Sequence, residues 1–230
     1  METTMQSLGR RPMPMSAPET ENLSERRNRS RLLACGIPPR FLGADFAGYV
    51  VRDAMAETAK ARGKVLDVCR AYAMRFREHA ALGRSMIFTG APGTGKTMLA
   101  CIIAKAVLTD GGTAKYATAY RLAGEVKDTY GRSAESERDV IARYVAPDLL
   151  VLDEIGMQYG TDAERLALWE VLNGRYESVK PTILVSNLTL PEMAAYVGDR
   201  VIDRMRENGG AVLAFTWESF RTGGNGNAGI

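Results

Sequence analysis

The sequence predicts an α/β fold in which helices cover both faces of a mostly parallel sheet. Short apolar runs alternate with helical segments along the body of the chain, which is typical of parallel strands joined by helical crossovers. A glycine-rich loop separates the first apolar run from a helix, as in folds that bind ligands at the carboxyl ends of strands. We expect these elements at 85–89, 97–110, 114–118, 120–130, 137–144, 148–153, 163–177, 182–186, 192–207 with a break near Gly198, and 211–216.

The front of the chain divides into a tail and a helical segment. Residues 1–22 are rich in Met, Pro, Ser and Thr without an apolar period, and we expect them to be disordered. Residues 23–82 form an N-terminal helical segment and linker: a basic helix over 23–35 that ends before Pro38, then helices over 49–61 and 64–82 broken near Gly63. In the last helix the apolar positions recur at three- and four-residue steps and should face the core: Val65, Cys69, Tyr72, Ala73 and Phe76.

The loop after the first strand carries the clearest chemical signal. Residues 90–97 (GAPGTGKT) fit G-x-x-x-x-G-K-[ST], in which backbone N–H groups close around a phosphate chain at a helix N-terminus. Lys96 should reach the β- and γ-phosphates, and the Thr97 hydroxyl should ligate Mg²⁺. The expected nucleotide-binding residues are Gly90, Ala91, Pro92, Gly93, Thr94, Gly95, Lys96, Thr97 and Met98.

Two strands end in polar side chains suited to hydrolysis. Residues 149–154 (LLVLDE) form an apolar strand that ends in adjacent carboxylates, and residues 182–186 are followed by an amide. Asp153 should hold Mg²⁺ beside Thr97, Glu154 should polarise the attacking water, and Asn187 should orient that water or contact the γ-phosphate. A small-molecule kinase is disfavoured because it must keep water from the γ-phosphate. A solvent-facing acidic strand end and a turn-forming Asn are the simpler alternatives.

The helix near the end carries alternating charges at Asp199, Arg200, Asp203 and Arg204. One interpretation is a salt-bridged surface helix, because opposite charges stand three residues apart. Residues 222–230 are rich in Gly and Asn and should form a flexible tail.

Composition and charge limit the kind of nucleic-acid contact that we expect and indicate the cellular compartment. The 230 residues carry a net charge of +3, and residues 1–40 hold seven Arg against four Glu, so the rest of the chain is neutral. A neutral body favours a local nucleic-acid contact over a broad basic surface. Cys35, Cys69 and Cys101 form no close pair, and His79 is the single histidine, so we expect reduced thiols, no histidine metal site and a solvated His79. The absence of a signal-peptide pattern or a long apolar run predicts a cytoplasmic protein without membrane contact.

The order of these motifs resembles the AAA+ ATPases and, more narrowly, the replicative helicase loaders of the DnaC type and their phage relatives. The resemblance covers Gly36 to Arg221 and rests on residues 36–41 (GIPPRF), 126–130 (VKDTY), 153–158 (DEIGMQ), 199–206 (DRVIDRMR) and 215–221 (FTWESFR), besides the phosphate loop. The last two segments favour the loaders over the related IstB-type transposition ATPases.

The resemblance implies a P-loop NTPase of three α/β/α layers with a five-stranded sheet in the order 5-1-4-3-2. It places the AAA+ domain at 83–221, with a lid domain that is absent or vestigial. It also implies ATP and Mg²⁺ as cofactors, with slow hydrolysis stimulated by DNA and oligomerisation. The implied partners are a DnaB-type replicative helicase, which the chain would load onto single-stranded DNA, the single-stranded DNA itself and further copies of the chain. The 23–82 segment is the possible helicase-binding element. The alternative function is an IstB-like ATPase that assists a transposase on duplex DNA.

Several residue roles follow only from the resemblance. Arg204, with Arg200 as the second choice, would act as an arginine finger on a neighbouring subunit's γ-phosphate, and Arg221 would sense nucleotide. Tyr130, Lys127 and Thr161 would contact DNA, Tyr130 by stacking on a base. A tyrosine packed against its own helix is the simpler alternative.

Overall fold

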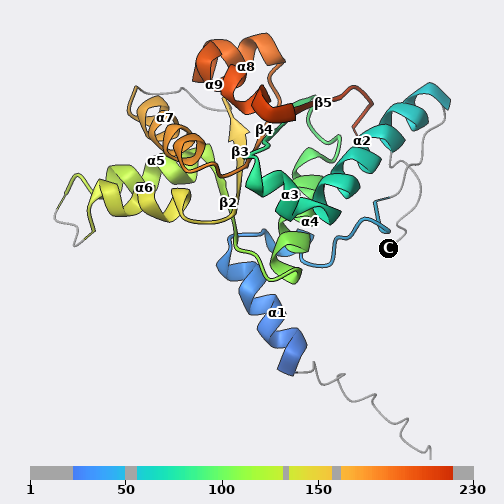
Figure 1. The fold of residues 1–230 in the computed structure, drawn as a ribbon, viewed down its shortest axis with the longest axis horizontal. Helices are drawn as coiled ribbons and strands as arrows, with labels where there is room; N and C mark the ends of the chain where they lie inside the picture. Colours follow the sequence, from blue (N-terminus) through green and yellow to red (C-terminus); the bar gives the residue numbers. More distant parts are fainter. Residues whose placement is uncertain (1–22, 50–55, 132–134, 157–161, 220–230) are drawn as a thin grey trace, which may run out of the picture.

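In the computed structural model, five parallel strands form one central sheet (Figure 1). The structure describes residues 23–49, 56–131, 135–156 and 162–219. The strands are β1 (Met86–Gly90), β2 (Ala114–Thr118), β3 (Leu149–Ile155), β4 (Thr182–Ser186) and β5 (Ala211–Phe215). Their order is β2-β3-β4-β1-β5, and each neighbouring pair is parallel. The predicted fold class and the predicted strand order are therefore confirmed.

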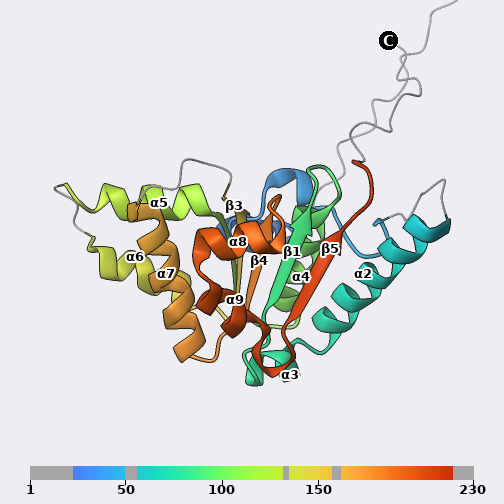
Figure 2. The ribbon, with the colours of Figure 1, turned by 90° about the horizontal axis from the view of Figure 1, so that it is seen from above.

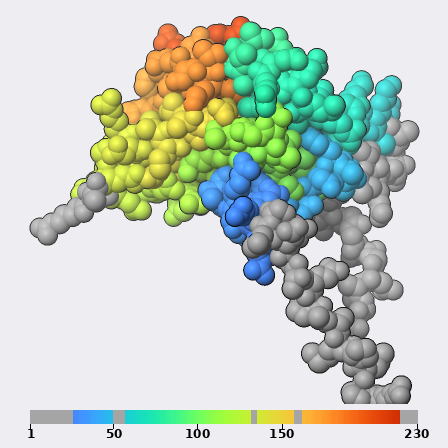
Figure 3. Space-filling model, turned by 60° about the horizontal axis from the view of Figure 1, so that its bottom comes forward, coloured from blue at the N-terminus to red at the C-terminus, as the bar shows by residue number. Residues whose placement is uncertain are grey.

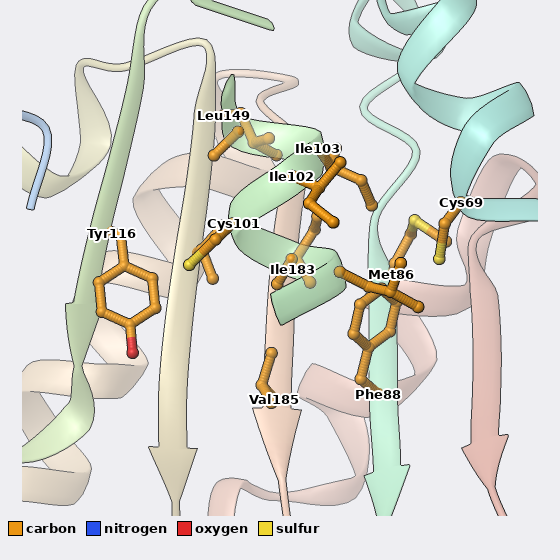
Figure 4. Packing of buried hydrophobic residues seen from close by; sticks show 14 of the residues in the cluster. Cys69, Met86, Phe88, Cys101, Ile102, Ile103, Tyr116, Leu149, Ile183 and Val185 are labelled. Carbon is orange, nitrogen blue, oxygen red and sulfur yellow. The ribbon is translucent and has the colours of Figure 1, made fainter. Parts of the chain in front are cut away.

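Helices cover both faces of this sheet (Figure 2). One core lies between the sheet and α2 (Ala56–Met74) and α4 (Lys96–Thr109), and it takes in residues from α1 (Leu23–Ala34) and α3 (Phe76–Ala81). The opposite core is closed by α5 (Ala119–Asp128), α6 (Glu137–Val145), α7 (Asp162–Glu177), α8 (Leu190–Val197) and α9 (Asp199–Arg206). Short 3₁₀ turns occupy Pro39–Phe41 and Glu207–Gly209. Apolar side chains of α4 meet those of the strands at the centre of the first core (Figure 4).

The predicted helix boundaries are partly wrong. The expected break at Gly63 does not occur, because α2 runs through it and ends near Arg75. A Cβ added at Gly63 would meet nothing within 4 Å, so this glycine serves no close approach, and the packing of α2 against α4 outweighs its low helix propensity. The predicted break at Gly198 is confirmed: its φ of +95° separates α8 from α9. Val65, Cys69, Tyr72 and Phe76 are buried, and Ala73 is partly buried against the same core, as predicted.

The chain after β5 has no helix among the described residues, and the environment of His79 differs from the prediction. Residues 216–219 follow β5 without a helix in the described part of the chain, and residues 1–22 and 222–230, predicted to be tails, lie outside it. His79 is not fully solvated, because its ring stacks on Tyr72 at 4.6 Å between centroids. Burial and the neighbouring Arg84 lower the pKa of His79 below its ordinary value. No helix among the described residues combines the length and the apolarity needed to cross a bilayer.

A buried arginine fixes the loops that precede β3 and β4. Arg175 in α7 is 1% exposed and donates to the carbonyls of Tyr144, Val145, Pro147, Asp148 and Pro181 and to the hydroxyl of Thr182. These bonds anchor the starting ends of two strands whose other ends carry Asp153 and Asn187.

Candidate nucleotide site

The phosphate loop joins β1 to α4 at the carboxyl edge of the sheet. Gly95 precedes α4 with a φ of +94°, and a Cβ added there would lie 2.9 Å from the Tyr49 ring, so only glycine fits. No side chain caps α4, whereas Thr118, Ser136 and Thr189 cap α5, α6 and α8. As in any α-helix, the first N–H groups of α4 have no acceptor within the helix, and they lie at the positive end of the helix dipole. This geometry suits an anionic group.

The ammonium of Lys96 is fixed inside the loop. Lys96 is 5% exposed, and its Nζ donates to the carbonyls of Gly90 at 2.6 Å and Ala91 at 2.7 Å. Because backbone acceptors already hold the cation in place, little side-chain entropy remains to be lost when a phosphate binds. The predicted contact of Lys96 with the β- and γ-phosphates stays a prediction.

A bulge at the end of β3 brings two adjacent carboxylates to one pocket. Leu152 pairs with Leu184 and Ile155 with Ser186, so β3 holds one residue more than β4 over this stretch. Glu154 takes up that extra residue with a φ of +60°, a backbone conformation that costs an L-residue free energy and occurs at functional sites. In a regular strand the two side chains would point to opposite faces. Asp153 is buried, Glu154 is exposed, and both line the same pocket.

The pocket at this edge has a volume of about 520 Å³. It brings together most of the predicted site, namely residues 92–98, Asp153, Glu154 and Asn187. Gly90 and Ala91 form the base of the loop through their bonds to Lys96. The pocket is also lined by residues to which no role was assigned: Arg40, Phe41, Gly48, Tyr49 and Ser186. Residues 36–41 carry the family resemblance, and nothing in their spacing indicates a pocket wall.

The residues at the pocket fit a nucleotide-bound magnesium ion. The Thr97 hydroxyl and the Asp153 carboxylate are hard oxygen donors that line the same pocket. Among the described residues no group of three or more His, Cys, Asp or Glu side chains could hold a metal. Mg²⁺ keeps several waters and binds through one or two protein oxygens plus phosphates, so two protein ligands suffice.

Asp153 is held by two hydrogen bonds. Its Oδ2 accepts from the Tyr116 hydroxyl at 2.8 Å, and its Oδ1 accepts from the Glu154 N–H at 2.8 Å. Burial and the Asp153 charge raise the pKa of Tyr116 above its ordinary value, so the hydroxyl stays protonated and donates. No sequence pattern indicates this contact, because Tyr116 and Asp153 lie in separate strands.

The segment after β5 closes over the phosphate loop. The Trp217 indole N–H donates to the Thr94 carbonyl at 2.8 Å, and the Tyr49 hydroxyl donates to the same oxygen at 3.4 Å. The Trp217 ring packs on Phe215 at 5.0 Å and lies 5.2 Å from the Arg62 guanidinium carbon. Trp217 thus links the end of β5 to the centre of the loop.

This contact predicts an optical signal. The chain has two tryptophans, so Trp169→Phe leaves Trp217 alone. Adding ATP to that variant should change the Trp217 emission in a saturable way, because the indole is bonded to the loop that contacts the phosphates. The reverse variant, Trp217→Phe, should give no response, since Trp169 is exposed on α7. A response from Trp169 alone would contradict the assignment.

Two of the predicted arginines, Arg200 and Arg204, lie outside the nucleotide pocket. Arg200 is exposed at the start of α9. Arg204 lies 4.4 Å over the Tyr176 ring, donates to Asn173 Oδ1, and lines a second pocket of about 280 Å³ at the amino edge of the sheet. No ion pair among the described residues involves either arginine, which disfavours the salt-bridged helix. Neither side chain lines the nucleotide pocket of its own subunit.

The structure describes two of the three residues predicted to contact DNA. Tyr130 follows α5 and is 59% exposed, and Lys127 is exposed in the last turn of that helix. This exposure favours the stacking role over a ring packed against its own helix. Tyr120, at the other end of α5, is 62% exposed and was not predicted. Thr161 and Arg221 lie outside the described residues.

Comparison with known proteins shows the family. A family model described as IstB-like ATP binding protein matches residues 68–221. The replicative helicase loader DnaC of Escherichia coli (strain K12) is 32% identical over 187 residues, which cover 81% of this chain and 73% of that protein. The chain belongs to the DnaC and IstB-like group of AAA+ ATP-binding proteins. The resemblance stated from the motifs is therefore confirmed.

Solved structures of AAA+ proteins share the fold. A crystal structure of the DnaC helicase loader has a TM-score of 0.66 and 22% identity, covering 77% of this chain and 99% of that one. A structure of AMPPCP-bound DnaA from Aquifex aeolicus has a TM-score of 0.60 and 20% identity, covering 78% of this chain and 51% of that one.

Proposed function

We propose that this chain binds and hydrolyses ATP and loads a hexameric replicative helicase onto single-stranded DNA. The observation that carries the proposal is the single pocket that gathers Lys96, Thr97, Asp153, Glu154 and Asn187 in a chain of the DnaC and IstB-like group. The AAA+ domain would occupy residues 83–221 and the helicase-binding element residues 23–82.

The chain's own groups account for nucleotide binding. The α4 N–H groups and Lys96 would bind the phosphates, since both are fixed at the loop before the ligand arrives. Thr97 and Asp153 would hold Mg²⁺, which would neutralise negative charge on the phosphates when bound. Arg40, Phe41 and Tyr49 would form the wall away from the loop.

Hydrolysis would depend on Glu154 and Asn187. The bulge directs the Glu154 carboxylate into the pocket, where it would accept a proton from the attacking water. Asn187 follows β4 at the same edge and would orient that water through its amide. Arg204 would complete the site of a neighbouring copy, because it lies away from its own nucleotide pocket. Arg200 is the second choice for that role, and Arg221 remains the predicted nucleotide sensor.

DNA would bind along α5. Tyr130 exposes its ring beside Lys127, a combination suited to stacking on a base while the ammonium contacts the backbone. Tyr120, near the start of α5, would be a further exposed aromatic contact, and Thr161 remains a predicted contact.

The helicase would bind at α1. This helix projects from the body at one edge (Figures 1 and 3), and its side chains from Arg26 to Arg31 are exposed. Leu32 and Cys35 at its end are buried in the core, so the helix is anchored to the ATPase body. A basic, anchored helix can dock an acidic groove of a partner.

Reversing two charges tests this contact without removing the buried anchor. We expect Arg26→Glu with Arg27→Glu to abolish capture of the purified helicase while ATP affinity is retained. The matched control is Lys60→Glu with Lys64→Glu, two exposed cations on α2. Equal capture by both double variants would place the helicase contact elsewhere on the chain. Capture of a transposase instead of a helicase would favour the IstB-like alternative.

A further inference from the structure

Tyr116 occupies a position from which it can orient the acidic end of β3. Tyr116 in β2 pairs with Val151, two residues before Asp153 in β3. The Tyr116 ring extends along the strand direction and covers these two residues, so its hydroxyl reaches the Asp153 carboxylate. Its hydroxyl points toward the carboxyl end of the strands (Figure 4) and donates to Asp153 Oδ2 at 2.8 Å. Both side chains are buried, at 8% and 5% exposure.

The hydroxyl completes a pair of bonds that fixes the carboxylate. The Glu154 N–H holds Oδ1 and the Tyr116 hydroxyl holds Oδ2, so the carboxylate cannot rotate about its Cβ–Cγ bond without breaking both. Each carboxylate oxygen keeps a further lone pair for another ligand. A group held in one orientation by neighbouring hydrogen bonds binds a metal more tightly than a freely rotating one.

The backbone of Tyr116 is held in turn by the chain that follows α1. The Tyr116 N–H donates to the Cys35 carbonyl at 2.7 Å, which covers the outer edge of β2. Gly36 has a φ of +90°, and a Cβ there would lie 2.2 Å from the Tyr116 carbonyl oxygen, so the close approach requires glycine. Ile37, the next residue, is 1% exposed. Residues 35–36, which follow the basic helix α1, therefore contact Tyr116, the residue whose hydroxyl bonds to Asp153.

We propose that Tyr116 is a positioning residue for Asp153, seated by residues 35–37, and that its hydroxyl sets the affinity of the nucleotide site for Mg²⁺. This inference rests on the proposed magnesium role of Asp153. Tyr116 contacts neither nucleotide nor metal in this scheme and acts only through the carboxylate.

The test is Tyr116→Phe, which removes one oxygen and keeps the buried ring. Binding of the fluorescent analogue mant-ATP is measured across a magnesium titration and again with EDTA. We expect the midpoint magnesium concentration to rise about 10–100-fold. Binding in EDTA should be unchanged, and saturating magnesium should restore hydrolysis. The matched control is Tyr72→Phe, a buried tyrosine that donates to the Arg84 carbonyl away from the pocket, and its midpoint should not move.

Asp153→Asn, measured alongside, separates the two levels of the proposal. If Asp153→Asn weakens the magnesium response while Tyr116→Phe titrates like the unaltered chain, the positioning role of Tyr116 is overturned and the magnesium site stands. If neither variant changes the titration, the magnesium role of Asp153 is overturned, and the Tyr116 proposal with it.

Discussion

Glu154→Gln should bind ATP with unchanged affinity and hydrolyse it about 10²–10⁴-fold more slowly, the usual effect of removing a general base. The amide occupies the volume of the carboxylate but does not accept the proton of the attacking water. The free-energy cost of a φ of +60° is the same for Gln as for Glu, because both side chains are unbranched at Cβ. The bulge and the position of Asp153 should therefore be preserved. Near-normal turnover would remove Glu154 from the catalytic role.

The companion substitution, Lys96→Ala, should impair ATP binding, the step that precedes hydrolysis. Its ammonium supplies charge-assisted hydrogen bonds, each worth about 1.5–3 kcal/mol, so ATP affinity should fall at least about 10–100-fold. ATP affinity by equilibrium binding and single-turnover hydrolysis separate the two variants. The controls are Glu170→Gln and Lys64→Ala, which lie outside the pocket and should behave as the unaltered chain.

The second large effect concerns the boundary between subunits. Arg204→Ala should keep ATP affinity and lose the part of hydrolysis that DNA or oligomerisation stimulates. An arginine acting in trans is worth about 10³–10⁵ in rate in other phosphoryl-transfer systems. We expect a smaller loss of at least about 10-fold here, because loader-type hydrolysis is slow. Arg206→Ala, an exposed arginine two residues further along α9, is the control and should retain stimulation.

Mixing the Arg204→Ala and Lys96→Ala variants, each of which lacks stimulated hydrolysis alone, identifies an arginine that acts across subunits. In a mixed assembly, an Arg204→Ala subunit provides an intact Lys96 pocket, and a Lys96→Ala neighbour provides the arginine. Some activity should therefore return on mixing. An arginine whose role is the observed contact with Asn173 and Tyr176 within its own subunit would give no rescue. Absence of rescue in oligomers shown by mass to be mixed would thus exclude the finger role.

The elements that local pattern determines could be predicted from the sequence. The spacing of the Gly, Lys and Thr residues in 90–97 predicts the phosphate loop, because a glycine-rich turn with this spacing between a strand and a helix is typical of phosphate binding. The strand order came from the family resemblance, since spacing does not show which strands are neighbours. Gly63 was misjudged because helix propensity is local, whereas the packing of α2 on α4 is tertiary.

The contacts that complete the site could not be predicted, because they join segments far apart in the chain. Tyr49 and Trp217 meet at the Thr94 carbonyl from opposite ends of the sequence. The bulge that turns Glu154 toward the pocket depends on the pairing of β3 with β4. Arg204 was assigned a role by resemblance, but its place at the amino edge of the sheet required the fold.

A loading assay tests the central claim most directly. The hexameric replicative helicase of the organism that encodes this chain is incubated with ATP and closed circular single-stranded DNA, and helicase bound to the circles is isolated by gel filtration. We expect helicase on the circles with the unaltered chain and none with Lys96→Ala. The same amount of circle-bound helicase with the unaltered chain, with Lys96→Ala and without the chain would contradict the proposed function.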